Sequence, residues 1–266
     1  MTRNPEFPLT NSFLVLRDRA AVLNFEMRQA CTKLKYDVRY MPGACERGTF
    51  QLFSRPPLTL DVKARTQSGE TLDLTIINNH WKSKGGDEAV NAVRREAQAL
   101  HVASLVQEKI DANPSANVIV LGDLNDFYTS PSVDALLNAT TPALVHTYDF
   151  LPELERYTYS FNGANQVLDH ILVSPSLVPM IGGVDPVHIN SDYPYPVETD
   201  ASNVYHSSDH DPIVLRLSPT GRGWIAANVG YGGVQVALID ATGQTTDTGT
   251  SDELGEVRLW NVKPGK

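Results

Sequence analysis

The chain has 266 residues, 41% of them hydrophobic and 20% charged, an ordinary balance for a globular protein of one large or two small domains. A formal net charge of −9 and a sequence pI of about 5.2 argue against a basic groove as the main source of nucleic-acid affinity. An acidic protein can still act on phosphodiesters if divalent cations supply positive charge. No apolar stretch approaches the roughly 18 residues of a membrane helix, and no signal peptide is visible at the N-terminus.

The first fifty residues carry few clear signals. Ser12–Arg17 fits a strand, whereas residues 18–48 follow no clear period. Cys31 and Cys45 lie in this part, and they could close a short disulfide loop or be two unrelated thiols. Two cysteines do not fix the redox compartment.

The middle of the chain predicts a strand–helix–strand unit. Alternating apolar residues indicate strands, and apolar residues at spacings of three and four indicate a helix. The predicted elements are a strand over Leu58–Val62, a turn at Gln67–Glu70, a strand over Leu72–Asn78, a helix over Glu88–Ala112 and a buried strand over Val118–Leu121.

The remainder predicts one short helix and then strands. Pro131 is placed as a first-turn proline of the helix, and Asn162-Gly163 is a strong hairpin signal. The predicted strands are Tyr157–Phe161, Val167–Val173, Ile213–Leu217, Val234–Asp240 and Glu256–Trp260. Because the character of the sequence changes after Ser218-Pro219-Thr220-Gly221, we place a domain boundary near residue 220.

Polar side chains follow or interrupt apolar strands at four places. These pairs are Asn79/His80, Asp123/Asn125, Asp169/His170 and Asp209/His210. A carboxylate without a partner is too costly inside a buried strand, so the acids are expected where strands end, at the edge at which open α/β sheets bind ligands. Each pair alone is explained as well by a capped turn or a core histidine. Four pairs in the same relation to a strand favour one functional site.

The side chains in these pairs suit metal-assisted phosphoester hydrolysis. Oxygen ligands favour Mg²⁺ or Mn²⁺, and histidines can act as general acid or base. Zinc fits less well, because the sequence has no H-E-x-x-H and no paired cysteine ligands. Nucleoside triphosphate hydrolysis is not favoured, because no Gly-rich loop ending in Lys-Ser/Thr is present.

Four motifs, in order, resemble those of the endonuclease/exonuclease/phosphatase superfamily with its DNase I-like fold. They are N-N-H-W-K-S-K-G-G-D, V-I-V-L-G-D-L-N-D-F, Q-V-L-D-H-I-L-V-S and S-S-D-H-D-P-I. The resemblance covers roughly residues 50–217 and is nearest to bacterial secreted nucleases, of which S-R-P-P-L and F-N-G are also typical. It implies an α/β (α+β) fold, a four-layer sandwich of two packed mixed sheets, in residues 1–220. Residues 221–266 resemble the start of an immunoglobulin-like or prealbumin-like β module.

The resemblance also implies five catalytic residues. His80 would contact the scissile phosphate and transfer protons. Asp123 and Asn125 would orient the attacking water and the phosphate. Asp169 would be the acid of the L-D-H strand, and His210 the final catalytic histidine.

Metal and phosphate contacts follow from the same motifs. Asp123 and Asp209 would bind the metal, which the resemblance implies to be Mg²⁺ or Mn²⁺, with Ca²⁺ as an alternative. Asn79, Lys82 and Lys84 are candidate phosphate contacts. Secretion or display at the cell surface is implied by the resemblance alone, since the chain shows no signal peptide.

The chain departs from the family pattern at its beginning. The family opens with a strand that carries an Asn, followed by a metal-binding Glu, and neither is in the expected place. Gln107-Glu108 lies in the predicted helix after His80, and Asn24 and Glu26 have no strand-plus-helix pattern around them. We therefore expect residues 1–220 to be the C-terminal two thirds of the domain, with the remaining segment supplied by a longer or a separate polypeptide.

The sequence leads to a nuclease as the first hypothesis. A Mg²⁺- or Mn²⁺-dependent phosphodiesterase acting on DNA or RNA fits the motifs, although superfamily members also hydrolyse sphingomyelin and inositol phosphates. A second hypothesis is a catalytically incomplete domain that serves binding or surface display. An exposed sheet edge left by the absent strands would predict self-association.

Overall fold

The computed structural model describes residues 10–35, 39–42, 45–66, 69–195, 204–218 and 223–262. The chain divides into two compact units. The first unit contains Met1–His146 and Leu168–Ser176, and the second contains Thr147–Val167 and Leu177–Lys266. The predicted boundary near residue 220 and the predicted turn at Gln67-Ser68 fall outside the described residues.

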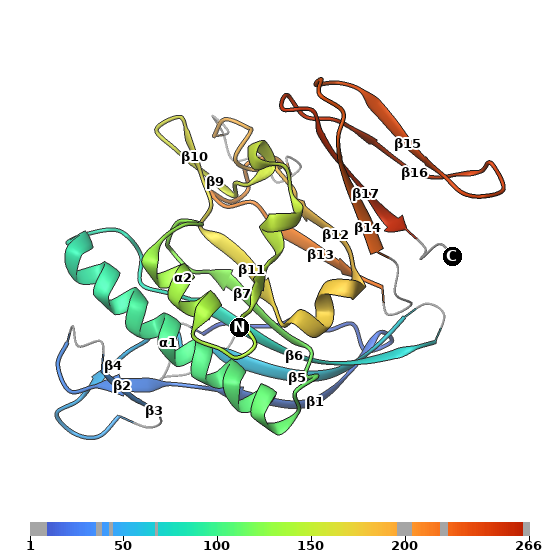
Figure 1. The fold of residues 1–266 in the computed structure, drawn as a ribbon. Helices are drawn as coiled ribbons and strands as arrows, with labels where there is room; N and C mark the ends of the chain where they lie inside the picture. Colours follow the sequence, from blue (N-terminus) through green and yellow to red (C-terminus); the bar gives the residue numbers. More distant parts are fainter. Residues whose placement is uncertain are drawn as a thin grey trace. The chain divides into compact units, whose positions relative to one another are not determined.

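The first unit is built on a six-stranded sheet in the order β1-β5-β6-β7-β11-β8 (Figure 1). The strands are β1 (Ala20–Met27), β5 (Leu58–Arg65), β6 (Thr71–His80), β7 (Val118–Asp123), β8 (Val145–His146) and β11 (Asp169–Val173). β6 and β7 pair in parallel, and the other neighbours are antiparallel. The connection between the two parallel strands contains helix α1, so the predicted strand–helix–strand unit is confirmed.

Helix α1 (Glu88–Ala112) has the bounds that apolar spacing predicted. The Asp87 side chain caps its first turn by accepting a hydrogen bond from the Ala89 backbone N–H, and Lys109 lies in its last turn. Helix α2 (Pro131–Asn138) begins in the same way, with the Ser130 hydroxyl as its cap. No helix among the described residues is both long and apolar enough to cross a membrane.

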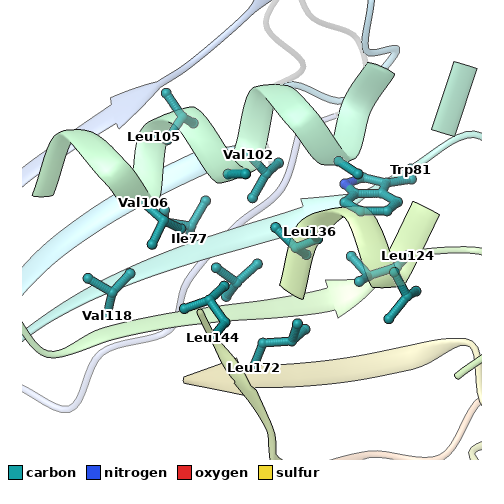
Figure 2. Close-up of a cluster of buried hydrophobic side chains, with 14 of the residues drawn as sticks. Ile77, Trp81, Val102, Leu105, Val106, Val118, Leu124, Leu136, Leu144 and Leu172 are labelled. Atoms are coloured by element: carbon teal, nitrogen blue, oxygen red, sulfur yellow. The ribbon is translucent and has the colours of Figure 1, made fainter. Parts of the chain in front are cut away.

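The two helices and the sheet share one hydrophobic core (Figure 2). Val102 and Val106 of α1 and Leu136 of α2 are fully buried in the same cluster as Ile77 and Val118 of the sheet. Burial of each such side chain stabilises the fold by about 1.5–3 kcal/mol. This core fixes α1 and α2 relative to the ends of β6 and β7.

The N-terminal part differs from the prediction. The predicted strand over Ser12–Arg17 is wrong: no strand is assigned there, and the Asn78 side-chain amide donates to the Ser12 carbonyl oxygen. Strand β1 follows instead and pairs with β5. It carries Asn24 and Glu26, and a further strand, not a helix, follows it.

A small three-stranded sheet, β3-β2-β4, also belongs to the first unit. Its strands are β2 (Ala30–Thr32), β3 (Tyr40–Pro42) and β4 (Phe50–Gln51). Cys31 and Cys45 form a disulfide with a Cα–Cα distance of 5.4 Å. They therefore close a short loop and are not two unrelated thiols.

The second unit consists of two-stranded antiparallel sheets. The pairs are β9 (Tyr159–Phe161) with β10 (Ala164–Gln166), β12 (Ile181–Pro186) with β13 (Ile213–Leu217), β14 (Gly223–Asn228) with β17 (Glu256–Val262), and β15 (Gln235–Ile239) with β16 (Thr245–Thr250). The described residues also form three short 3-10 helices, η1 (Thr147–Phe150), η2 (Glu153–Glu155) and η3 (Pro175–Met180). Strands β12 and β14 were not predicted.

The parallel pairing of β6 with β7 requires a glycine at position 122. Gly122 has a φ of +124°, and a Cβ built on it would lie 2.1 Å from the Asn79 carbonyl oxygen. No side chain fits that distance, and L-residues rarely adopt that backbone conformation.

We expect Gly122→Ala to lower the free energy of unfolding of the first unit by about 3 kcal/mol or more, because the two backbones must separate. Gly69→Ala is the matched control, since Gly69 also has a positive φ, +90°, but has nothing within 4 Å of a built Cβ. Its cost should be about 1 kcal/mol, from the left-handed backbone alone. Urea unfolding followed by circular dichroism measures both, and equal losses would contradict the steric explanation.

Candidate metal and active site

Strand register brings three of the four predicted polar pairs to one edge of the sheet. His80 ends β6, Asp123 ends β7 and Asp169 begins β11. Asp123 is the register partner of both His80 and Asp169. Partners in a ladder project their side chains to the same face. A carboxylate oxygen of Asp123 accordingly lies within 4.8 Å of one of Asp169.

His80 is held between a cation and a carboxylate. Its Nε2 lies 3.6 Å from Asp123 Oδ2, and Arg55 Nη1 lies 2.5 Å from its Nδ1. Arginine can only donate, so Nδ1 accepts this hydrogen bond and Nε2 carries the proton of the neutral ring. Sequence reasoning quoted the S-R-P-P-L motif but gave Arg55 no role.

Asn125 fixes the Asp123 carboxylate. Its backbone N–H donates to Asp123 Oδ1 at 2.8 Å, and its side-chain amide donates to Oδ2 at 2.9 Å. The same amide donates to the Trp81 carbonyl oxygen at 3.2 Å. Asn125 has a φ of +52°, a conformation that asparagine tolerates better than most residues. The predicted pair Asp123/Asn125 is therefore one hydrogen-bonded element.

The donor set at this edge fits a hard divalent cation. Asp123 and Asp169 are both partly exposed carboxylates, and two carboxylates this close repel one another unless a cation or a proton intervenes. Mg²⁺ characteristically binds through one or two carboxylates and completes its shell with water and substrate phosphate oxygens. Asp123 and Asp169 are therefore the candidate metal ligands of the first unit.

The three candidate phosphate contacts have partners within the protein. Asn79 is buried, and its side chain donates to the Ile77 carbonyl oxygen and accepts from the Trp81 indole. Lys82 Nζ donates to the backbone and hydroxyl oxygens of Ser83. Lys84 Nζ, described below, takes part in ion pairs. Contact between these side chains and phosphate stays a prediction.

Asp126, directly after the predicted pair, is the centre of a buried ionic network. Its carboxylate accepts from Arg95 Nε, Lys84 Nζ and Ser132 Oγ, each at 2.8 Å. Burial alone would raise the pKa of Asp126, but these hydrogen bonds and the nearby cations outweigh it and lower the pKa. Arg95 is fully buried and also pairs with Glu88. The network ties the loop after β7 to both helices.

A second buried chain of hydrogen bonds supports the same loop. His170 follows Asp169 on β11, so its side chain points to the opposite face. Its Nε2 donates to the Asp126 carbonyl oxygen, and its Nδ1 accepts from His146 Nε2, both at 2.9 Å. Complete burial lowers the pKa of His170 to about 4, so the ring is neutral at pH 7.

The fourth predicted pair, Asp209/His210, lies in the second unit. The His210 carbonyl oxygen accepts from the Asn190 amide at 2.6 Å. The next residue, Asp211, is buried and accepts hydrogen bonds from the backbone N–H groups of Asn190 and Ser191. Burial raises the pKa of Asp211, but bonds from Ser191, His188 and Asn190 outweigh this effect and lower the pKa. Sequence reasoning did not identify Asp211, whose partners lie some twenty residues away.

Comparison with known proteins relates the middle of the chain to a family. Residues 58–182 match the model of the Endonuclease/Exonuclease/phosphatase family. No curated protein matches the chain by sequence. This match, together with the mixed sheet and its few helices, confirms the predicted DNase I-like fold class. The packing of two sheets into four layers stays a prediction.

Several solved structures are similar to the chain. One is a Bacteroides thetaiotaomicron mannosyl-6-phosphatase, with 17% identity over 76% of this chain and 68% of that chain and a TM-score of 0.48. A functionally unknown Enterococcus faecalis protein has 12% identity over 76% and 68%, with a TM-score of 0.48. The human Nocturnin catalytic domain with bound sulfate has 14% identity over 75% and 62%, with a TM-score of 0.42. The chain thus spans about two thirds of the length of these structures.

We expect Asp126→Asn to lower the free energy of unfolding by about 3 kcal/mol at pH 7, because it leaves buried Arg95 without a full counter-charge. The folded pKa of Asp126 lies below the unfolded value of 3.8, so its stabilisation is present above pH 3.8 and is lost as the pH falls through the folded pKa. The difference between wild type and variant should shrink below pH 3.8. Asp134→Asn, an exposed acid on α2, should change stability by no more than about 0.5 kcal/mol. A gap that persists at pH 2.5 in urea titrations would contradict the ionic explanation.

We expect the wild-type chain to lose stability as the pH falls from 6.5 towards 4. Unfolded His170 takes up a proton in this range whereas the folded residue does not, a difference of roughly 3 kcal/mol. His170→Gln should weaken this pH dependence without abolishing it. Burial also lowers the pKa of His101 to about 4, so His101 should still contribute to the loss of stability at low pH. Urea unfolding at pH 7 and pH 5 measures the effect. An unchanged slope in the variant would show that His170 is protonated in the folded chain.

Proposed function

Residues 58–182 match the Endonuclease/Exonuclease/phosphatase family, and we propose on this premise that the chain is a divalent-metal-dependent nuclease. The observation that carries the proposal is the register of β6, β7 and β11, which brings His80, Asp123 and Asp169 to one edge of the sheet. In metal-assisted phosphoester hydrolysis, a pair of acids can bind the metal and a neighbouring histidine can transfer a proton or donate to the phosphate.

Asp123 and Asp169 would hold the metal, which in family enzymes stabilises negative charge on the reacting phosphate. Asn125 holds the Asp123 carboxylate in one orientation through both of its oxygens. His80 presents the N–H of Nε2 on the same side as this carboxylate, where it can donate to a phosphate oxygen. Preorganised donors of this kind need little rearrangement as charge develops.

His210 is proposed as the general base that takes a proton from the attacking water. This role rests on its S-S-D-H-D-P motif, in which Asp209 would orient the ring or contribute to metal binding. Asn190 donates to the His210 carbonyl oxygen and to the Asp211 side chain, and these bonds restrain the backbone directly after His210. The side chain is partly exposed and so accessible to water.

DNA or RNA is the proposed substrate. The motifs resemble those of the nuclease branch, of which F-N-G before L-D-H-I-L-V-S is typical. With a net charge of −9, the chain depends on the metal and on a few local donors to offset repulsion from a polyanion. Lipid and inositol phosphates are the competing substrates.

We expect the purified chain to nick supercoiled plasmid with Mg²⁺ or Mn²⁺ and not with EDTA. Asp123→Asn and His80→Asn should each lower the rate by about 10²–10⁴-fold, because they remove a ligand or a donor to the phosphate. Glu96→Gln, an exposed acid on α1, is the charge-matched control and should keep the wild-type rate.

His210→Asn tests the proposed base separately. The variant's cleavage rate relative to wild type should be lowest below the pH optimum and should partly recover at high pH, where hydroxide can replace the base. Parallel assays on RNA, sphingomyelin and an inositol phosphate identify the substrate class. A chain that is folded by circular dichroism but cleaves none of these would contradict autonomous catalysis and support the incomplete-domain hypothesis.

A further inference from the structure

Three aromatic rings form a row in the second unit, from His210 along strand β9. The Tyr159 and His210 ring centroids are 4.9 Å apart, and an isolated β-bridge joins the two residues through their backbones. The rings of Tyr159 and Phe161 are 6.4 Å apart and nearly parallel, with an interplanar angle of 14°. Tyr159 and Phe161 lie two residues apart on a strand and therefore share one face.

The row ends in solvent. Phe161 is 52% exposed, and it lies at the end of β9, next to the turn of the β9–β10 hairpin (Figure 1). Asn162 and Gly163 both have positive φ, +52° and +79°, as a tight hairpin turn requires. Pairing of Phe161 with Ala164 and of Tyr159 with Gln166 sets the register of the hairpin. Backbone pairing thus holds Tyr159 and Phe161 in place, with Tyr159 partly buried and the Phe161 ring exposed to solvent.

The acid of the neighbouring S-S-D-H-D-P motif, Asp209, acts electrostatically on the Tyr159 phenol. Burial, and to a smaller degree Asp209 and Tyr195, raise the pKa of the Tyr159 phenol. The Asp209 carboxylate would repel a phosphate brought to this end without a metal. An aromatic row beside an acid is therefore better suited to a neutral planar group than to a backbone phosphate.

We propose that Tyr159 and Phe161 stack the base of a nucleotide next to the scissile phosphate, and that the enzyme consequently prefers single-stranded nucleic acid. The inference rests on the proposed nuclease function and deepens it. Base–aromatic stacking is independent of sequence because every base has a π-face. In a duplex these faces are covered by neighbouring base pairs, so only unpaired or frayed strands offer them. With a net charge of −9, stacking would add affinity that does not depend on attraction to the phosphate backbone.

The test measures binding without cutting. A fluorescein-labelled single-stranded 12-mer is titrated by anisotropy with Mg²⁺ against chains that all carry Asp123→Asn. Phe161→Ala should weaken binding by about 5- to 150-fold, the range for loss of one stacked base, whereas Phe161→Trp should restore it. Tyr231→Ala is the matched control, because Tyr231 is a 76% exposed aromatic of the same unit. The blunt-ended duplex of the same sequence should bind more weakly than the single strand and should be insensitive to Phe161→Ala.

An abasic scan identifies the stacked base. Replacing each base in turn by an abasic site should weaken binding to the Phe161-containing chain at one position only, and the same replacement should cost little in Phe161→Ala. Equal effects of every abasic site in both chains would overturn the proposal. So would an absence of oligonucleotide binding, or loss of binding to phosphatidylcholine vesicles in Phe161→Ala with no change for the oligonucleotide, which would indicate a lipid surface as partner.

The outcomes separate this inference from the proposed function. Metal-dependent plasmid nicking together with Phe161-independent binding would leave a nuclease without an aromatic subsite. Phe161-dependent binding from a wild-type chain that hydrolyses no phosphoester would support the stacking subsite and contradict the catalytic proposal.

Discussion

The close parallel approach of β6 and β7 positions the site in the first unit. It occurs where the backbone of Gly122 passes the Asn79 carbonyl oxygen with no room for a Cβ. One residue further along, the same register sets His80 beside Asp123. The Trp81 N–H donates to the Asp123 carbonyl oxygen at 2.9 Å and continues the pairing past the ends of the strands. A single backbone constraint thus fixes two side chains that are 43 residues apart in sequence.

Behind this edge, buried charges hold the loop that carries Asn125. Removing Asp126 and Arg95 from water is costly, and the cost is offset because each ion has several hydrogen-bonding partners. His170 adds a neutral bond to the Asp126 backbone. The loop therefore depends on partners from both helices and from β11, so the orientation of Asp123 depends on groups that contact no substrate.

Local sequence patterns predicted the parts of this arrangement that depend on local interactions. Helix α1 and strands β5 to β7 have strong periodicity and clear ends, and the predicted polar pairs mark the strand ends that meet at the site. Strand β1 was missed because most of its residues are exposed, including Leu23 and Phe25, so no alternation marks it. Arg95 could not be identified as a partner of Asp126 from the sequence. The helical spacing indicates that Arg95 lies on the buried face of α1, but it does not show that Arg95 donates to an acid 31 residues away. The disulfide was undecidable from two cysteines, because its formation depends on how β2 pairs with its neighbours.

Charge limits how this chain can recognise a polyanion. A net charge of −9 disfavours nonspecific attraction to a phosphate backbone, so the proposed binding would depend on a few local contacts. In the first unit, many cations are already committed: Arg95 and Lys84 neutralise Asp126, and Lys109 neutralises Asp61. The proposed metal would add positive charge only at the scissile phosphate, and the proposed aromatic subsite would add affinity without adding charge. Recognition built from these two contributions favours a flexible strand that can present one phosphate and one base at a time, whereas a duplex would bring a dense row of phosphates to an acidic surface.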